Sequence, residues 1–241
     1  MATLEENRFW DKYDWPRGGD EWTDQADFCG MAYPLWKRDI VDAFIVPSIT
    51  EDSTVLELAM GHGRWTPFLA ERARRYIGVD FSPSSVNFCR KHFAHLANVT
   101  FFCTDGRTLS PIASNSVQFV WSFDSFVHIE PDVTEGYMAE IARVLSPGGQ
   151  CTIHHPGTPS REQRVNGGRS ALSRSLFAHM ANTNGLRILS QRDSWGPRNR
   201  SNTKLFADCI STIEKPIEAP IRDVPHPEPI VSLTKPLTES F

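Results

Sequence analysis

From Thr54 onward, the apolar positions of the chain follow two alternating patterns. Short runs rich in β-branched and aromatic residues, typical of buried strands, are separated by segments whose apolar residues recur at helical spacing. The strand-like runs cover residues 54–59, 75–81, 98–104, 117–123, 150–155, 186–191 and 205–213. This alternation predicts an α/β fold: a Rossmann-like, doubly wound and mostly parallel sheet of seven strands with helices between them.

Four of the intervening segments are predicted to be helices. Their apolar residues recur at helical spacing within residues 65–73, 86–96, 137–145 and 172–180. The third helix is expected to stop at the sequence SPGG, residues 146–149, because proline and glycine interrupt a helix. The sheet and its helices together define a central domain, residues 51–214.

The two ends of the chain have a different composition. Residues 1–50 contain four of the seven tryptophans. This indicates either a helical cap that buries aromatic side chains or a lid whose aromatic wall, including Trp15 and Trp22, contacts a substrate. Residues 215–241 have a proline every few positions, which is incompatible with a regular helix or a central strand. They are expected to form an extended or disordered tail.

Charge and composition argue against several classes of function. The formal net charge of −4 gives no clustered basic surface of the kind that tracks nucleic-acid phosphates. No apolar run reaches the roughly 18 residues of a membrane span, and the acidic, aromatic N-terminus is unlike a signal peptide. The five cysteines form no CxxC pair, so neither a zinc site nor a disulfide framework is expected. The sequence predicts a cytoplasmic protein with a small-molecule substrate, no nucleic acid and no membrane partner, and it leaves the oligomeric state open.

Small and acidic residues gather at the ends of the first three predicted strands. The sequence ELAMGHG, residues 57–63, closes the first strand, and its glycines allow a tight turn and a close approach of the backbone to a ligand. Asp80 ends the second strand, and Asp105 and Gly106 follow the third. Ligands of a wound parallel sheet bind at the carboxyl ends of the strands. These residues are therefore expected to form one site.

With the segment WSFDSFVHIEP after the fourth strand, these motifs resemble the class I S-adenosylmethionine-dependent methyltransferases over residues 54–157, and more loosely as far as residue 215. The glycine-rich loop of that family is E/DxGxGxG, which ELAMGHG matches except that Ala59 stands in place of the first glycine. The resemblance implies S-adenosyl-L-methionine as the cofactor and an antiparallel last strand at residues 205–213. It also implies a set of cofactor-binding residues: Glu57, Ala59, Gly61 and Gly63 at the methionine end, Asp80 at the ribose, Asp105 and Gly106 at the adenine, and Phe123 beside them.

Two other classes share part of this pattern. An NAD-dependent dehydrogenase also has a glycine loop and a following acidic residue, but its GxGxxG motif places glycine where this chain has Thr66. A branched side chain at that position would separate the helix from the strand that it must approach closely. A non-catalytic protein that binds S-adenosylmethionine stays open as a second alternative.

Methyl transfer to a hydroxyl group requires an acceptor placed close to the methyl carbon and a base that takes its proton. Three histidines lie at predicted strand ends, namely His128 after the fourth strand and His154 and His155 in the fifth. His128 is the first candidate base, His154 or His155 the second, and Asp124 an orienting residue or substrate contact. Successive strand residues point to opposite faces, so His154 and His155 cannot both face the site. Asp124 and these histidines could ligate a divalent metal, but a magnesium ion prefers oxygen ligands, so a metal is possible but not supported and none is assigned.

The acceptor is predicted to be a small polar molecule with a hydroxyl group. The fourth strand is followed by SFDS and not by the NPPY-type sequence of enzymes that methylate amino groups or bases. Trp15, Trp22 and the carboxylates of the rim suit a sugar, and WSFDSFVHIEP together with HHPG resembles bacterial, mycobacterial-type sugar or mannoside O-methyltransferases. The first hypothesis is therefore O-methylation of a sugar or glycoside, with N-methylation of a small amine as the alternative.

Overall fold

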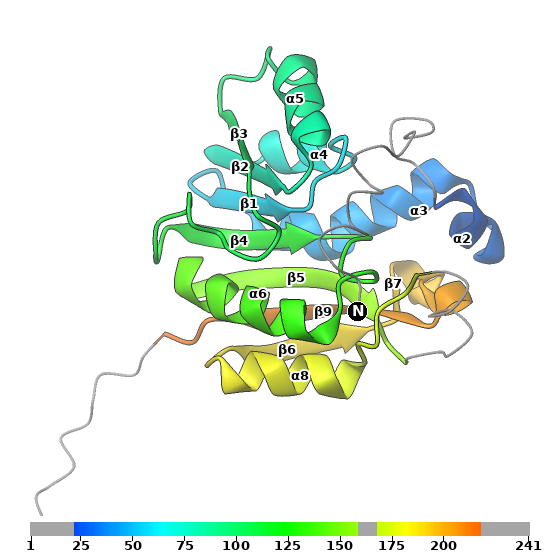
Figure 1. The fold of residues 1–241 in the computed structure, drawn as a ribbon. Coiled ribbons are helices and arrows are strands. Elements are labelled where there is room, and N and C mark those ends of the chain that lie inside the picture. The colour runs from blue at the N-terminus through cyan, green and yellow to red at the C-terminus, as the bar shows by residue number, and fades with distance from the viewer. Residues whose placement is uncertain (1–21, 159–167, 218–241) are drawn as a thin grey trace, which may run out of the picture.

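The computed structural model describes residues 22–158 and 168–217 and contains the predicted seven-stranded sheet (Figure 1). Its strands are β1 Thr54–Leu58, β2 Arg75–Asp80, β3 Val99–Cys103, β4 Val117–Ser122, β5 Leu145–Pro156, β6 Arg187–Arg192 and β9 Asp208–Glu214. Their order is β3-β2-β1-β4-β5-β9-β6. The pairings from β3 to β5 are parallel, whereas β9 runs antiparallel to both β5 and β6. The Rossmann-like α/β fold with an antiparallel last strand is thus confirmed.

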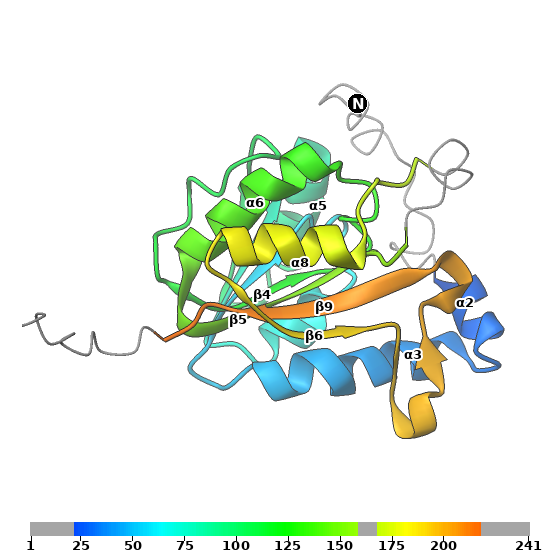
Figure 2. The same cartoon turned by 90° about the horizontal axis from the view of Figure 1, so that it is seen from below.

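Helices cover both faces of the sheet (Figure 2). Helices α3 (Tyr33–Ile40), α4 (Thr66–Ala70) and α5 (Pro83–His92) lie on one face, and helices α6 (Pro131–Val144) and α8 (Arg174–Thr183) lie on the other. Alternate residues of each strand feed two separate apolar cores. The carboxyl ends of β1 to β5 meet at one edge of the sheet, which is where ligands bind in such folds.

The residues before the sheet are helical in the described part of the chain. They form helices α2 (Thr23–Phe28) and α3 (Tyr33–Ile40), a π-helical turn η2 (Val41–Ile45) and a 3-10 turn η3 (Val46–Ser48). The rings of Trp22 and Trp36 stack with their centroids 5.6 Å apart, and both side chains are buried. These two tryptophans are therefore part of the core, whereas Trp15 lies outside the described residues.

The connection from β6 to β9 packs against these helices. It contains the short paired strands β7 (Ser194–Trp195) and β8 (Ser201–Asn202), with the 3-10 turns η4 (Pro197–Asn199) and η5 (Lys204–Phe206). The Trp36 indole donates a hydrogen bond to the Asn202 carbonyl at 3.2 Å, and Arg200 forms a two-point ion pair with Asp39. The N-terminal helices are thereby fixed to the connection between β6 and β9.

Two predicted element boundaries are wrong. Strand β5 begins at Leu145, directly after α6, so SPGG belongs to the strand and is not a loop between helix and strand. The pairing with β4 shifts register here, and Gly148 adopts a positive φ of +80°, as expected for a glycine at a β-bulge. The last strand begins at Asp208, later than predicted, because Ala207 turns the chain with a left-handed φ of +55°.

The predicted domain limits at residues 50 and 214 remain predictions, and residues 218–241 of the expected tail lie outside the described part. Among the described helices, none has the length and apolar character needed to cross a membrane.

Candidate active site

The loop after β1 turns tightly at the carboxyl edge of the sheet. Ala59, Gly61 and Gly63 all adopt positive φ values, of +52°, +54° and +79°. A Cβ atom at Gly63 would lie 2.4 Å from a ring carbon of Phe93, so glycine is required there for both conformation and space. Ala59 adopts the left-handed conformation that favours glycine, so the one departure from the family motif keeps the backbone shape and carries its strain.

Asp80 fixes this loop to the end of β2. Its two carboxylate oxygens accept hydrogen bonds from the backbone N–H of Gly61 and of Ser82, each at 2.9 Å, and the side chain is buried. The carboxylate is therefore held in one orientation beside the glycine loop and the start of α5. A carboxylate in this position is an acceptor that suits a partner with two neighbouring hydroxyl groups.

Glu57 lies near the end of β1, before the glycine loop. It is buried, and one of its carboxylate oxygens accepts hydrogen bonds from the Tyr76 hydroxyl at 2.6 Å and the Thr66 hydroxyl at 3.1 Å. Burial raises the pKa of Glu57 to about 7, although these two hydrogen bonds partly oppose the rise. The structure places Glu57 in the packing between β1, β2 and α4, where it supports the glycine loop from within.

Asp105 and Gly106 lie at the same edge of the sheet, after β3. Asp105 is exposed and accepts hydrogen bonds from the backbone N–H groups of Arg107 and Thr108. Although its limited burial opposes the change, these bonds hold the pKa of Asp105 below its usual value. Gly106 has a φ of +73°. The side chain of Asp105 thus stabilises its own turn. A ligand at this turn would mainly contact backbone groups.

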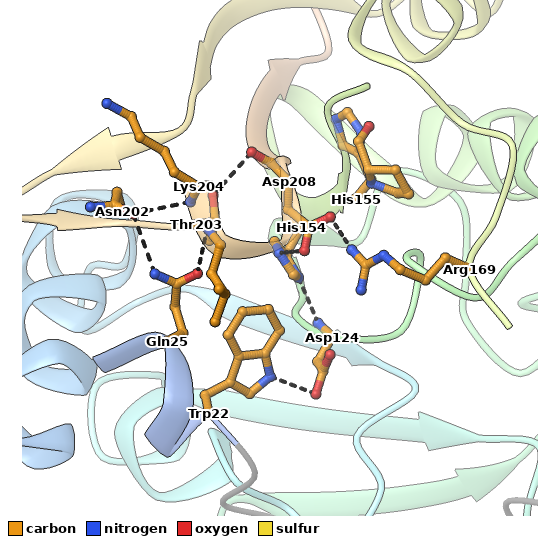
Figure 3. Close-up of polar contacts among 12 residues, drawn as sticks. Trp22, Gln25, Asp124, His154, His155, Arg169, Asn202, Thr203, Lys204 and Asp208 are labelled. Carbon is orange, nitrogen blue, oxygen red and sulfur yellow. Dashed lines mark hydrogen bonds and ion pairs between the residues drawn. The ribbon is translucent and has the colours of Figure 1, made fainter. Parts of the chain in front are cut away.

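Asp124 is the polar residue that the segment after β4 brings to the edge. It has a left-handed φ of +69°, and one carboxylate oxygen accepts a hydrogen bond from the indole of Trp22 at 2.7 Å (Figure 3). The same oxygen accepts a hydrogen bond from Arg64 at 3.2 Å. The preceding residue, Phe123, is buried and stacks on the ring of His154 with centroids 4.3 Å apart. The Asp124 carboxylate is therefore held at the rim by Trp22 and Arg64, which come from two distant parts of the chain.

His128 lies four residues beyond Asp124, in the turn before α6 and partly exposed. Its Nδ1 is 3.0 Å from the Gly168 carbonyl oxygen. Because a carbonyl only accepts, Nδ1 carries the proton in this contact, and the lone pair of the neutral ring is on Nε2. A general base that acts through Nε2 requires this tautomer, because it takes the proton with the Nε2 lone pair.

His154 and His155 point to opposite faces of β5, as the strand alternation requires. The structure does not bring His155 to the candidate site: its Nδ1 contacts the Pro156 carbonyl oxygen, its Nε2 contacts the Ser211 hydroxyl, and its ring stacks on Phe177. Burial lowers the pKa of His155 to about 3. Its predicted role as a base has no support in this geometry, because the ring is enclosed and both nitrogens have partners.

His154 is on the site face but is also fully buried. Its Nδ1 accepts a hydrogen bond from the backbone N–H of Asp124 at 3.2 Å, and its Nε2 lies 3.2 Å from a carboxylate oxygen of Asp208. Arg169 pairs with the other oxygen of Asp208 (Figure 3).

Sequence reasoning missed three charged members of this site, Arg64, Arg169 and Asp208. A signal was present for Asp208, since it is the one acidic residue within the apolar run of residues 205–213. In the described part of the chain, no three His, Cys, Asp or Glu side chains are grouped so as to hold a metal ion.

Comparisons with known proteins add information on the family. Residues 55–149 match a family profile described as a methyltransferase domain. The chain is 34% identical over 129 residues to a fatty-acid O-methyltransferase of Mycolicibacterium smegmatis, covering 49% of this chain and 46% of that protein. It is 33% identical over 127 residues to phosphoethanolamine N-methyltransferase 1 of Triticum aestivum, covering 49% of this chain and 25% of that protein. The matched region is thus less than half the length of either relative.

Among solved structures, the fold is similar to geranyl diphosphate C-methyltransferase from Streptomyces coelicolor A3(2) in complex with Mg²⁺, geranyl diphosphate and S-adenosyl-L-homocysteine. The TM-score is 0.64 at 16% identity, over 89% of this chain and all of that one. At this identity the similarity concerns the fold alone. The three names specify transfer to oxygen, to nitrogen and to carbon, so these proteins do not agree on an acceptor atom.

Proposed function

The chain contains a class I S-adenosylmethionine-dependent methyltransferase domain, and on that premise we propose that it methylates a hydroxyl oxygen of a small polar molecule. The observation that carries this proposal is the segment after β4. It brings the Asp124 carboxylate to the rim and, four residues later, a histidine whose Nδ1 contact leaves the lone pair on Nε2. A hydroxyl acceptor needs both a contact that orients it and a base.

The residues proposed to hold S-adenosylmethionine belong to the ends of β1, β2 and β3. The donor set fits the cofactor: the Asp80 carboxylate suits the two ribose hydroxyls, the glycine loop gives backbone contacts near the methionine end, and the Gly106 turn faces the adenine side. When bound, the cofactor supplies an electrophilic methyl group on a sulfonium. Glu57 acts indirectly, through the packing of the loop, and not as a ligand.

The residues proposed for the transfer step belong to the fourth strand end. Asp124 accepts a hydrogen bond from an acceptor hydroxyl or its neighbour and orients it, and His128 Nε2 takes the hydroxyl proton as the new oxygen–carbon bond forms and the carbon–sulfur bond breaks. Much of the acceleration of such a displacement comes from positioning. The buried aromatic residues around Phe123 exclude water from this side of the site.

The sugar or glycoside acceptor has weaker support than the hydroxyl group itself. Trp22, one of two tryptophans expected to stack on a sugar, is 5% exposed, and its indole N–H is already donated to Asp124. It therefore offers no open ring face. A sugar stays in the proposal as one candidate acceptor, supported by the carboxylate at the rim, and the comparison with a fatty-acid O-methyltransferase adds acids as a class to test.

A screen with methyl-labelled S-adenosylmethionine tests this function. Candidate acceptors are glycosides, other small alcohols, fatty acids and small amines, each assayed with the wild-type chain and with His128→Ala. We expect label on an oxygen of an alcohol or glycoside and little with His128→Ala. Label on amines alone would support N-methylation instead. Cofactor binding with no labelled product from any class would favour the non-catalytic alternative.

A further inference from the structure

Three strands are linked by one chain of polar contacts beneath the rim. The backbone N–H of Asp124, after β4, donates to His154 Nδ1 on β5 at 3.2 Å. His154 Nε2 faces Asp208 Oδ2 on β9 at 3.2 Å, and Asp208 Oδ1 pairs with Arg169 (Figure 3). Nearly all of this chain is out of reach of solvent, since His154 is 0% and Asp208 1% exposed.

Such a buried arrangement adds little to stability by itself. The desolvation of a buried carboxylate offsets most of the attraction that its partners provide. Moreover, His154 Nε2 and Asp208 Oδ2 face each other without the alignment of a good hydrogen bond, and in the described chain neither atom has another hydrogen-bonding partner. An apolar pair would fill this space at lower cost, so the polar residues call for an explanation other than stability.

The contacts of His154 define its tautomer. Nδ1 accepts the Asp124 N–H and so carries no proton, which leaves the single ring proton of the neutral imidazole on Nε2, directed at Asp208. Nδ1 is therefore occupied, Nε2 faces a buried carboxylate, and the ring is enclosed by Phe123 and Trp22, with centroids 4.3 Å and 5.0 Å away. His154 cannot take a proton from an acceptor in this arrangement.

We propose that His154 is a positioning residue, which Asp208 and Arg169 hold in one tautomer and orientation so that it fixes Asp124 in its left-handed conformation at the rim. A non-glycine residue with φ of +69° is strained and is maintained by its surroundings. The His154 contact supplies that support to the backbone, while Trp22 and Arg64 hold the side chain. The role of Asp124 toward an acceptor rests on the proposed function; the role of His154 toward Asp124 does not.

Two substitutions at His154 separate positioning from catalysis. In His154→Gln, the amide has an oxygen to accept the Asp124 N–H and an NH₂ group to face Asp208, but it cannot act as a base. His154→Leu lacks both groups. The matched control is His155→Gln, which changes the same residue type at the next position, on the opposite face and away from Asp124.

The first readout needs no acceptor. In hydrogen exchange measured by NMR, we expect the Asp124 amide to exchange about tenfold faster or more in His154→Leu, and to stay within a few-fold of wild type in His154→Gln and His155→Gln. The ¹⁵N spectrum of the wild-type ring should show the Nε2–H tautomer. An Nδ1–H or doubly protonated ring at neutral pH, or an unchanged Asp124 amide in His154→Leu, would overturn the proposal even if no acceptor is ever found.

The second readout is turnover with the acceptor from the screen. We expect His154→Leu to lower kcat by about 10- to 100-fold with the cofactor Kd unchanged, and His154→Gln to restore most of it. If His154→Gln is as inactive as His154→Leu and loses a limb of the pH–rate profile, His154 is a base and the proposal is wrong. If both variants turn over like wild type, the contact has no positioning role.

Should His154→Leu fail to fold, the double variant Asp208→Leu with Arg169→Met gives a second test. It removes the support of His154 Nε2 without leaving a lone buried charge. The proposal expects faster exchange of the Asp124 amide and a lower kcat in this variant also, and an unchanged amide with full turnover would contradict it.

Discussion

The two halves of the candidate site are built in different ways. On the cofactor half, at the ends of β1 and β2, the decisive contacts are made by backbone N–H groups over short sequence distances, as between Gly61 and Asp80, 19 residues apart. On the acceptor half, at the ends of β4 and β5, the contacts join side chains from distant segments, as between Trp22 and Asp124, 102 residues apart. The first half is a local motif, whereas the second exists only once the chain has folded.

The difference implies that binding and transfer can be lost separately. A change on the cofactor half should lower the affinity for S-adenosylmethionine, and a change on the acceptor half should lower the rate of transfer with affinity intact. Two substitutions test this separation, and two more test how the cofactor half is stabilised.

The largest effect is expected for His128→Ala. Loss of a general base lowers the rate by about 100- to 10,000-fold, and the Kd for S-adenosylmethionine should not change because His128 belongs to the acceptor half. Single-turnover transfer at saturating cofactor measures the effect. His95→Ala is the control, since His95 is an exposed histidine of the connection between α5 and β3. Wild-type rates in His128→Ala would remove this residue as the base.

Asp80→Ala should affect binding instead. The carboxylate is proposed to accept charge-assisted hydrogen bonds from the ribose, which contribute about 1.5–3 kcal/mol each. Their loss should lower the affinity for S-adenosylmethionine by about 100-fold or more. Asp105→Ala is the comparison: its side chain bonds to its own turn, so a decrease of less than about tenfold is expected. Equal losses in the two variants would contradict the assignment of the ribose to Asp80.

Glu57→Gln should change the pH dependence of stability on the cofactor half. The folded-state pKa of Glu57 is raised to about 7. The folded protein therefore keeps a proton on Glu57 up to about pH 7, whereas the unfolded chain releases it near pH 4.5. The contribution of this proton to the free energy of unfolding is fully present below pH 4.5 and is lost as the pH rises through 7. The free energy of unfolding should decrease by roughly 3 kcal/mol from this residue. Urea unfolding at a series of pH values between 4.5 and 8 should show that decrease in wild type and lack it in Glu57→Gln; parallel curves would contradict the buried, protonated state.

The smallest effect is expected for Ala59→Gly. Relief of the left-handed strain contributes about 1–2 kcal/mol and the entropy that glycine adds to the unfolded chain costs about 0.4–1 kcal/mol, so a net stabilisation of up to about 1.6 kcal/mol is expected. Ala70→Gly, within helix α4, should instead destabilise by about 1 kcal/mol. A lower Tm for Ala59→Gly would show that the methyl group makes contacts that outweigh the strain.

The fold, and the position of the glycine loop and Asp80 at the ends of β1 and β2, could be predicted from the sequence because the signals are local, whereas the cofactor-binding role of these residues stays a prediction. Each strand is a short apolar run, and the glycine loop and Asp80 follow their strands directly. The details that failed depend on neighbours. Residues 146–149 continue β5 because β4 pairs with Leu145 before them and with Gln150 after them, across a bulge. The buried contacts of the Glu57 carboxylate with Tyr76 and Thr66 also depend on residues distant in the sequence.

The acceptor half was predicted only in part for the same reason. Asp124 and His128 were identified because they directly follow a strand, but the pattern could not show that β9 would bring Asp208 under His154, or that Arg169 would reach it. It also could not show that Trp22 would be buried against Asp124 and so would not be an open surface for a sugar. Those placements follow from strand order and side-chain packing, which are properties of the whole fold.

Parallel calorimetric titrations of the wild-type chain, Asp80→Ala and His128→Ala with S-adenosylmethionine test the separation of the two halves most directly, with NADH as the competing ligand for wild type. The account predicts one binding site in wild type, the same Kd in His128→Ala, an affinity at least about 100-fold lower in Asp80→Ala, and no binding of NADH. Binding of NADH without S-adenosylmethionine, or equal loss of affinity in both variants, would contradict it.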